Sequence, residues 1–351
     1  MRGSHACIFK YFSFFILKNE NFVQPNARRN EIINRIKEAR DVPISRTGSG
    51  GWGIPVPGDE QQTIYVWIDA LFNYLTTVED DQRAKYWPAD VHLIAKDILW
   101  FHAVIWPTVL MALGRPLPRQ IYSHSFWISE GQKMSKSLGN FIDLEKIDEY
   151  IAQFSLDALR YYLATQGPLS ATDADFAHDK FVDVYNADLA NTLGNCLSRI
   201  CKMTYRYSNG VLSGSGYAKS KLTDAAAMAC VSFQKKLNVL DLTPAIQQAV
   251  GLVRMIDSYI EETKPFKLAK EKKNLPEVNI ILYNCAEAMR IASLLLWPVV
   301  PDKAEEIWRR LGCDEYSRRL ADRGRGELEV WWQWGSLKPG TQILEGDPLF
   351  P

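Results

Sequence analysis

The hydrophobic pattern of the chain changes its period near residue 130, and this change limits the folds that the chain can adopt. Between residues 60 and 130, turns or a helical pattern from Ile98 to Leu113 separate three apolar segments rich in β-branched and aromatic side chains: TIYVWIDAL, VHLIAKD and QIYSHSFWIS. From Asp175 to about Leu311, almost every segment reads as a long amphipathic helix. We therefore predict an α/β sheet followed by a separate helical bundle.

The length and charge of the chain limit its organisation further. At 351 residues the chain is long enough for two domains, since single cores seldom exceed about 250 to 300 residues. Its 41 basic and 41 acidic residues cancel, so any basic surface for a nucleic acid must be local. The apolar run at 8–18 is shorter than the roughly 18 residues that a membrane span needs. We predict a buried strand or helix there, and no membrane association.

The six cysteines indicate a reducing compartment. They lie far apart and form no CxxC pair, at Cys7, Cys196, Cys201, Cys230, Cys285 and Cys313. This spacing argues against a zinc knuckle and against a secreted disulfide scaffold. We expect free thiols, a cytoplasmic location and no bound metal.

The stretch GQKMSKSLGN, at residues 131–140, carries the strongest chemical signal. Its glycines permit tight turns, its serines offer hydroxyl and backbone donors, and Lys133 and Lys136 add two compact positive charges. A loop of this composition can bind phosphate groups, although a lone KMSKS can also be a solvated basic turn. The chain has no GxxxxGK[ST] motif, so a P-loop does not hold its nucleotide.

Several further stretches occur in the order found in one known family. KMSKS followed by LGN resembles the signature loop of class I aminoacyl-tRNA synthetases, and the whole chain resembles the methionyl-tRNA synthetases. The supporting stretches are RRNEI (28–32), ISRT (44–47), WGIPVPGD (52–59), IYVWIDAL (64–71), KDILWFHAVIWP (96–107), NADLANTLGN (186–195), LKPGT and PLFP. The resemblance covers nearly everything from about Asn21 onward.

The resemblance implies an order of domains. Residues 1–20 would hold a cloning scar, MRGSH, and the remnant of an upstream insert; 21–170 would be the second half of a Rossmann-like parallel-sheet domain with the KMSKS loop; 171–322 would be an α-helical anticodon-binding domain; and 323–351 would be a C-terminal strap.

Two helix signals within this order come from the residues themselves. Ser155 precedes SLDALRYYLATQ as a plausible N-cap. Pro107 lies inside the helical pattern at 98–113 and is expected to kink that helix.

The resemblance also implies a reaction. ATP would activate methionine to methionyl-adenylate, and the methionyl group would then pass to tRNA(Met), with Mg²⁺ accompanying the ATP. Lys136 would contact the leaving pyrophosphate, and Lys133 would assist. Ser135 and Ser137 would bind ATP together with these lysines.

Asp97 is the expected contact to the adenosine. It resembles the carboxylate that accepts hydrogen bonds from the ribose at the C-terminal end of a parallel strand. It can also act as the N-cap of the helix that starts at Ile98, and both roles can hold at once.

A methionine side chain requires an apolar, polarizable pocket, since a thioether forms only weak hydrogen bonds. The resemblance places five residues in the wall of that pocket: Trp67, Ala70, Tyr74, Ile98 and His102. His102 follows Ile98 by four residues, so both can face one side of a helix. For each residue taken alone, ordinary core packing is the more frequent explanation.

Three residues of the bundle are expected to read the tRNA anticodon. Asn195 and Arg199, four apart in a helix, can hydrogen-bond the edges of splayed bases. Phe266 would stack beneath a base, where Trp is common in the family, and so covers less area. A surface ion pair for Arg199 and a core position for Phe266 are the alternatives.

The family's second signature, a His-containing HIGH stretch, does not occur in this chain. We therefore expect the C-terminal part of the enzyme, a monomer unless a complementary N-terminal half exists. One alternative is a non-catalytic tRNA-binding fragment or paralogue. Another is a synthetase for leucine, valine or cysteine, against which WGIPVPGD and NADLANTLGN argue.

Overall fold

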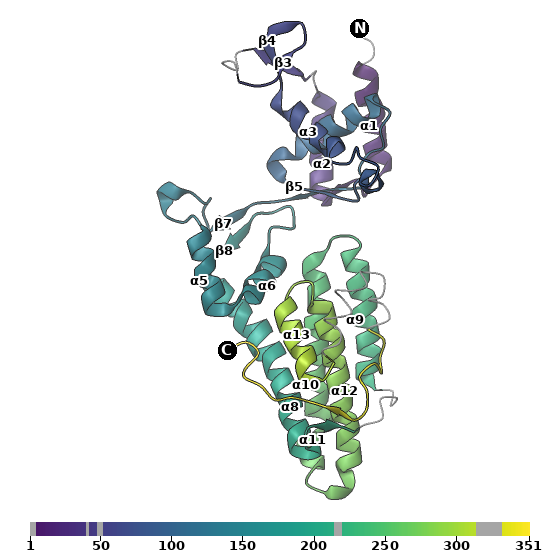
Figure 1. The fold of residues 1–351 in the computed structure, drawn as a ribbon, viewed down its shortest axis with the longest axis vertical. Coiled ribbons are helices and arrows are strands. Elements are labelled where there is room, and N and C mark those ends of the chain that lie inside the picture. The colour runs from purple at the N-terminus through teal and green to yellow at the C-terminus, as the bar shows by residue number, and fades with distance from the viewer. Residues whose placement is uncertain (1–4, 40–41, 48–51, 214–219, 314–331) are drawn as a thin grey trace. The chain divides into compact units, whose positions relative to one another are not determined.

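The computed structural model describes residues 5–39, 42–47, 52–213, 220–313 and 332–351, with side chains from Phe12 onward (Figure 1). The contacts divide the chain into two units. Unit 1 contains Met1–Trp127 and Pro168–Ala174; unit 2 contains Ile128–Gly167 and Asp175–Pro351. This division differs from the expected boundary at residue 170, because the KMSKS loop and the helices after it cluster with the bundle. The expected boundary at 322 lies outside the described residues.

Unit 1 contains a small parallel sheet. Strand β6 (Ile121–His124) lies between β1 (Val23–Gln24) and β5 (His92–Ala95), and pairs with both in parallel. The first three residues of β6 are buried, as expected for a central parallel strand covered on both faces. The segments VHLIAKD and QIYSHSFWIS therefore contain strands of an α/β sheet, as predicted.

The segment TIYVWIDAL is mostly helical, so the prediction of a strand along it is wrong. Strand β4 (Asp59–Ile64) pairs antiparallel with β2 (Ser45–Thr47) and β3 (Pro55–Val56), and it ends at Ile64. Helix α3 (Val66–Thr76) begins two residues later. Its buried residues Leu71 and Leu75 are four apart, which is the helical period. A short apolar run cannot distinguish the two periods by composition.

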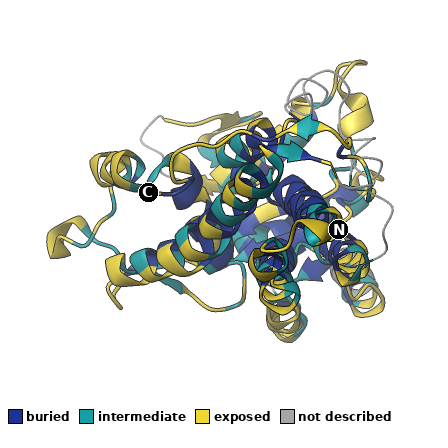
Figure 2. Ribbon diagram, turned by 90° about the horizontal axis from the view of Figure 1, so that it is seen from below, coloured by how far each residue is buried: buried dark blue, intermediate teal, exposed yellow. Residues whose placement is uncertain are grey.

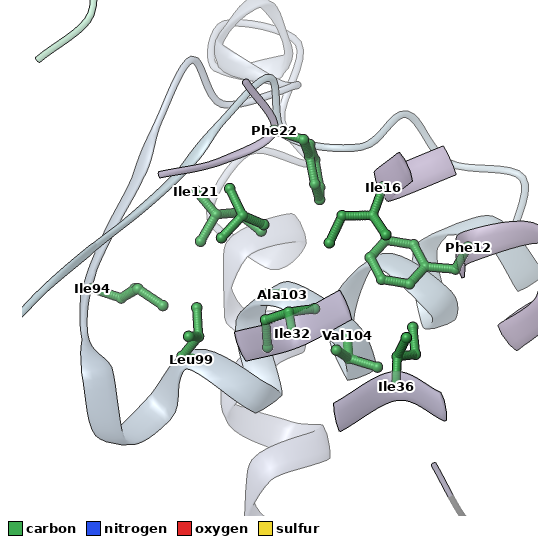
Figure 3. Close-up of a cluster of buried hydrophobic side chains, with 11 residues drawn as sticks. Phe12, Ile16, Phe22, Ile32, Ile36, Ile94, Leu99, Ala103, Val104 and Ile121 are labelled. Atoms are coloured by element: carbon green, nitrogen blue, oxygen red, sulfur yellow. The ribbon is translucent and has the colours of Figure 1, made fainter. Parts of the chain in front are cut away.

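Helices enclose the core of unit 1 beside the sheet. They are α1 (His5–Lys18), α2 (Asn26–Arg35) and α4 (Trp106–Ala112) with the π-helix before it (Phe101–Ile105). Figure 3 shows the cluster that these segments share, formed by Phe12, Ile16, Phe22, Val23, Ile32, Ile36, Ile94, Leu99, Ala103, Val104 and Ile121. The apolar run at 8–18 is thus a helix that packs into unit 1, as one of the two predicted alternatives.

Unit 2 is predominantly helical. Its helices are α5 (Leu144–Phe154), α6 (Leu156–Gln166), α7 (His178–Val184), the π-helix Tyr185–Gly194, α8 (Asn195–Ser208), α9 (Lys221–Leu237), α10 (Leu242–Thr263), α11 (Pro265–Leu268), α12 (Leu275–Leu296) and α13 (Pro301–Arg310). Ser155 caps α6 as predicted, since its Oγ accepts a hydrogen bond from the Ala158 N–H at 3.3 Å.

Helix α12 forms the centre of the bundle, between α8, α9, α10 and α13 (Figure 1). All its residues from Ile281 to Leu296 are buried. Figure 2 shows the same contrast across the molecule, where many helices have one buried and one exposed side. Among the described residues, only the segment Lys272–Leu296 is long and apolar enough to cross a membrane. Its apolar window is 89% buried within the protein, as in the core helix of a bundle.

The C-terminal residues 332–351 pack as an irregular strap against the bundle, as predicted. Strand β10 (Thr341–Gln342) pairs antiparallel with β9 (Val211–Leu212). The buried apolar side chains of the strap are Leu337, Ile343, Leu349 and Phe350. The strap thus buries apolar surface, while its backbone groups need partners from the helices.

A buried carboxylate on α12 supplies partners to the strap. Glu287 is fully buried and accepts hydrogen bonds from the backbone N–H groups of Gly335 (2.8 Å), Ser336 (3.0 Å) and Leu337 (3.2 Å). Its counter-charge is Arg290, also fully buried, at 2.7 Å. A single buried ion pair therefore joins the central helix to the strap.

Replacing Glu287 by Gln should lower the free energy of unfolding by about 3 to 5 kcal/mol, because the buried Arg290 loses its counter-charge. Urea unfolding of both proteins measures this difference. The control is Glu305→Gln on α13, where the side chain is exposed and the expected change is within about 0.5 kcal/mol. Equal losses for the two variants would contradict the role of the buried pair.

Candidate functional site

Lys133 and Lys136 lie on an exposed loop between β7 (Trp127–Ser129) and α5. Gly131 has a φ of 73° and Gly139 a φ of 68°, which is the left-handed conformation that residues with a Cβ rarely adopt. The two glycines therefore turn the chain at the two ends of the loop. Both lysines are exposed, and neither forms an ion pair with a described residue.

The serines of this loop face one another. The hydroxyl groups of Ser135 and Ser137 are 2.7 Å apart, and either can donate. The backbone N–H of Ser135 donates a hydrogen bond to the Oδ1 of Asn140 at 2.9 Å. The groups that remain for an anion are thus two ammonium groups and a pair of hydroxyls, without a carboxylate from the loop itself.

Unit 1 contains an aromatic cluster built on α3. Trp67, Ala70 and Tyr74 are spaced by three and four residues, so they lie on one side of this helix. The ring of Trp67 stacks on that of Phe101, with centroids 4.2 Å apart. The Tyr74 hydroxyl lies 2.9 Å from Nε2 of His102. The structure therefore brings Trp67, Tyr74 and His102 together. Ala70 is exposed on the same side of α3, and Ile98 packs against the hydrophobic cluster of Figure 3. That these residues line a pocket for an amino acid stays a prediction.

The π-helix that carries the histidine has an identifiable cause. Pro107 has no backbone N–H, and its ring clashes with the carbonyl four residues earlier in a regular α-helix. The turn before it widens into the π-helix Phe101–Ile105. The Thr108 hydroxyl donates to the carbonyls of Val104 (2.9 Å) and Ile105 (2.8 Å). The irregularity beside Pro107 is thus a π-helical turn, a feature frequent at functional sites, and the predicted kink itself stays a prediction.

The hydrogen bonds of His102 assign its tautomer. Nδ1 lies 3.1 Å from the Ile98 carbonyl, which can only accept, so Nδ1 carries the hydrogen and Nε2 accepts from the Tyr74 hydroxyl. Burial lowers the pKa of His102, although the bond to Ile98 acts in the opposite direction. The ring is therefore neutral near pH 7, and the pocket wall carries no formal charge from it.

His92 lies beside this pocket, and sequence reasoning did not assign it there. Its ring centroid is 4.3 Å from that of Tyr74 and 6.1 Å from that of His102. Burial, and secondly the charge of His102, lower its pKa to about 4. The alternation along β5, with His92 and Ile94 buried and Leu93 exposed, is the signal that points it inward.

Asp97 is exposed, two residues beyond the last residue of β5, and its contact to a ribose stays a prediction. It lies inside a 3-10 turn, Lys96–Ile98, whose N-cap position is Ala95 without a side-chain hydrogen bond. The expectation that Asp97 is an N-cap is therefore wrong, because the helical turn begins one residue before it.

The three expected anticodon residues lie in the bundle. Asn195 is exposed at the start of α8, and Phe266 is 38% exposed in α11. Arg199 donates to Asp257 at 2.8 Å and to Glu261 at 2.5 Å, both on α10. Two of its five N–H donors are thus used within the bundle, and three have no partner among the described residues.

The described cysteines are free and buried, as predicted for reduced thiols: Cys196, Cys201, Cys230, Cys285 and Cys313. The side chain of Cys7 lies outside the described residues. Within the described part of the chain, no group of three or more His, Cys, Asp or Glu side chains could hold a metal ion.

This arrangement permits two kinds of recognition. The paired lysines suit a polyphosphate, since ammonium groups neutralise charge that grows on leaving phosphate oxygens. The aromatic cluster on α3, with a neutral histidine, suits contact with an uncharged and polarizable side chain.

Known proteins share the sequence and the fold of this chain. The family model described as tRNA synthetases class I (M) matches residues 9–201. The methionine–tRNA ligase of Caldanaerobacter subterraneus is 38% identical over 98% of this chain and 52% of its own length. That of Bacillus subtilis is 37% identical over 98% of this chain and 51% of its own length. The chain spans about half the length of these curated relatives.

The solved structures agree with the sequence matches. Mycobacterium tuberculosis methionyl-tRNA synthetase in complex with methionyl-adenylate superposes with a TM-score of 0.84 at 30% identity. The match covers 98% of this chain and 67% of that one. The fold and the family model lead to one assignment: this chain belongs to the methionyl-tRNA synthetases of class I.

Proposed function

We propose that this chain carries out part of the methionine–tRNA ligase reaction. The observation that carries the proposal is that this chain, a member of the family, has two features together. One is an exposed loop whose two lysines form no ion pair with a described residue, and the other is a cluster of aromatic rings around a neutral His102. In the first step, a carboxylate oxygen of methionine bonds to the α-phosphorus of ATP, and the bond to the β-phosphate breaks. In the second step, a hydroxyl of the terminal ribose of tRNA(Met) attacks the methionyl carbonyl, and AMP leaves.

Lys136 and Lys133 act on the first step without becoming nucleophiles. As the bond to the β-phosphate breaks, negative charge grows on the departing pyrophosphate, and the ammonium groups neutralise it. Ser135 and Ser137 offer hydroxyl donors to the phosphates, and the Asp97 carboxylate accepts from the ribose. Mg²⁺ would accompany ATP, and within the described part of the chain no group of three or more His, Cys, Asp or Glu side chains could hold it.

The pocket on α3 selects the amino acid. Trp67, Ala70 and Ile98 supply apolar contact, and the neutral His102 fixes Tyr74 by accepting its hydroxyl hydrogen. A charged side chain would be desolvated there without a counter-charge, at a cost of several kcal/mol. A thioether loses little on entry, because it forms only weak hydrogen bonds in water.

The remaining partners follow from the same proposal. Asn195, Arg199 and Phe266 would bind the anticodon of tRNA(Met). Because the chain spans about half the length of its curated relatives, we propose that it works with a complementary half, and otherwise as a monomer, in the cytoplasm where translation occurs. A tRNA-binding fragment without catalysis is the alternative that the next experiment tests.

Replacing Lys136 by Ala should lower methionine-dependent pyrophosphate exchange by a factor of about 100 or more in the enzyme assembled with a complementary half. Methionine affinity should change little, because the pocket belongs to unit 1. The control is Lys146→Ala, which removes an equally charged, exposed residue from α5. A Lys136→Ala enzyme that keeps most of its rate, while the parent is active, would remove this lysine from the mechanism.

Replacing Arg199 by Ala should weaken binding of tRNA(Met) by about 1 to 3 kcal/mol and leave pyrophosphate exchange intact, because a contact to a base edge is lost. Arg206→Ala is the matched control, since it removes the same charge two turns along α8. Filter binding with tRNAs of different anticodons measures both. An equal loss for every anticodon would instead indicate a phosphate contact.

A further inference from the structure

The loop with the two lysines is closed by a residue that the reaction itself does not use. The Oδ1 of Asn140 accepts a hydrogen bond from the backbone N–H of Ser135 at 2.9 Å. Its Nδ2 donates to the carbonyls of Ser129 and Lys133, each at 3.2 Å. One amide side chain thus pairs three backbone groups, from the strand before the loop and from the loop itself.

A second side chain, independent of Asn140, fixes the start of the loop at Gly131. The N–H of Gly131 lies 3.0 and 3.1 Å from the two carboxylate oxygens of Asp175, in the strand β8 (Ala174–Phe176) that pairs with β7. The ladder between Ser129 and Gln132 adds two backbone hydrogen bonds at 2.8 and 3.0 Å. The base of the loop is therefore fixed, while the segment carrying the lysines depends on Asn140.

Only an amide of this length satisfies all three groups. Two of them are carbonyls that need a donor, and one is an N–H that needs an acceptor. A carboxylate would serve the N–H but face both carbonyls with a lone pair, and alanine would serve none. Asn140 itself is half-buried, whereas Lys133, Lys136 and Ser137 project into solvent.

We propose that Asn140 is a positioning residue: by closing the loop 131–140, it presets Lys133 and Lys136 together for a polyphosphate. The polyphosphate role rests on the function proposed above. Without the amide, the backbone from Lys133 to Ser135 loses its shared partner, and the two ammonium groups sample separate positions. Binding of a polyphosphate then includes the entropy of ordering the loop.

The first experiment measures loop closure on the full chain without any substrate. Trypsin cuts after lysine only when the backbone opens, so cleavage after Lys133 and Lys136 reports the open population. Loss of the three hydrogen bonds in Asn140→Ala should speed this cleavage about tenfold. Asn140→Asp, which keeps the acceptor for Ser135, should fall between Asn140→Ala and the parent.

The matched control is Gln132→Ala in the same turn. Its backbone hydrogen bonds to Ser129 remain, and its side chain makes no hydrogen bond with a described residue, so cleavage should match the parent. Far-UV circular dichroism and cleavage at sites in the bundle report whether the variants are folded. Parent-like cleavage of folded Asn140→Ala would overturn the proposal.

The second experiment measures positioning with inorganic pyrophosphate as the probe. We measure the pyrophosphate concentration that halves the rate of tryptic cleavage after Lys133 and Lys136. This concentration should rise about tenfold in Asn140→Ala and stay unchanged in Gln132→Ala. An unchanged value in Asn140→Ala, or no protection of the parent, would overturn the positioning role. Because neither readout needs turnover, a parent enzyme without methionine-dependent exchange would contradict the proposed function alone.

Discussion

The irregular segments of this chain depend on single polar side chains that pair backbone groups which the segments cannot pair themselves. Glu287 is the strongest example, because a fully buried carboxylate accepts three consecutive N–H groups of the C-terminal strap and an Arg290 guanidinium. A buried charge is tolerated only when such bonds compensate its lost hydration. The strap can therefore cover the apolar bundle without a strand or helix along its whole length.

Single polar side chains also hold the segment 168–174 and the lysine loop 131–140. In unit 1, Arg28 donates to the Ala171 carbonyl at 2.9 Å, and Lys96 pairs with Asp173, so the segment 168–174 is attached to the parallel sheet. In unit 2, Asn140 has the equivalent role for the lysine loop. The half-buried amide of Asn140 closes its loop by a smaller free energy than the fully buried ion pair of Glu287 and Arg290 contributes to the strap. The lysine loop therefore needs less free energy to open than the strap does.

Local patterns were enough to predict some features of the chain. The apolar, β-branched composition of VHLIAKD predicted a strand of an α/β sheet, Ser155 predicted a helix cap, and the glycines of residues 131–140 predicted tight turns in the lysine loop. The resemblance to the KMSKS loop identified Lys133 and Lys136 as candidate phosphate-binding residues. Periodicity failed at residues 63–71, where a strand ends and a helix begins within one apolar run. The pairing of Arg199 with Asp257 and Glu261 was not predictable either. These partners lie 58 and 62 residues further along the chain, and the pairing depends on how α8 packs against α10.

We propose that this chain supplies the lysine loop and the amino-acid contacts of a methionine-specific ligase. The most direct test is pyrophosphate exchange by the chain assembled with a complementary half, with methionine, leucine, valine or cysteine offered separately. We expect exchange with methionine alone, and none by residues 1–351 without the other half. Comparable exchange with leucine, or steady methionine-dependent exchange by the lone chain, would contradict it.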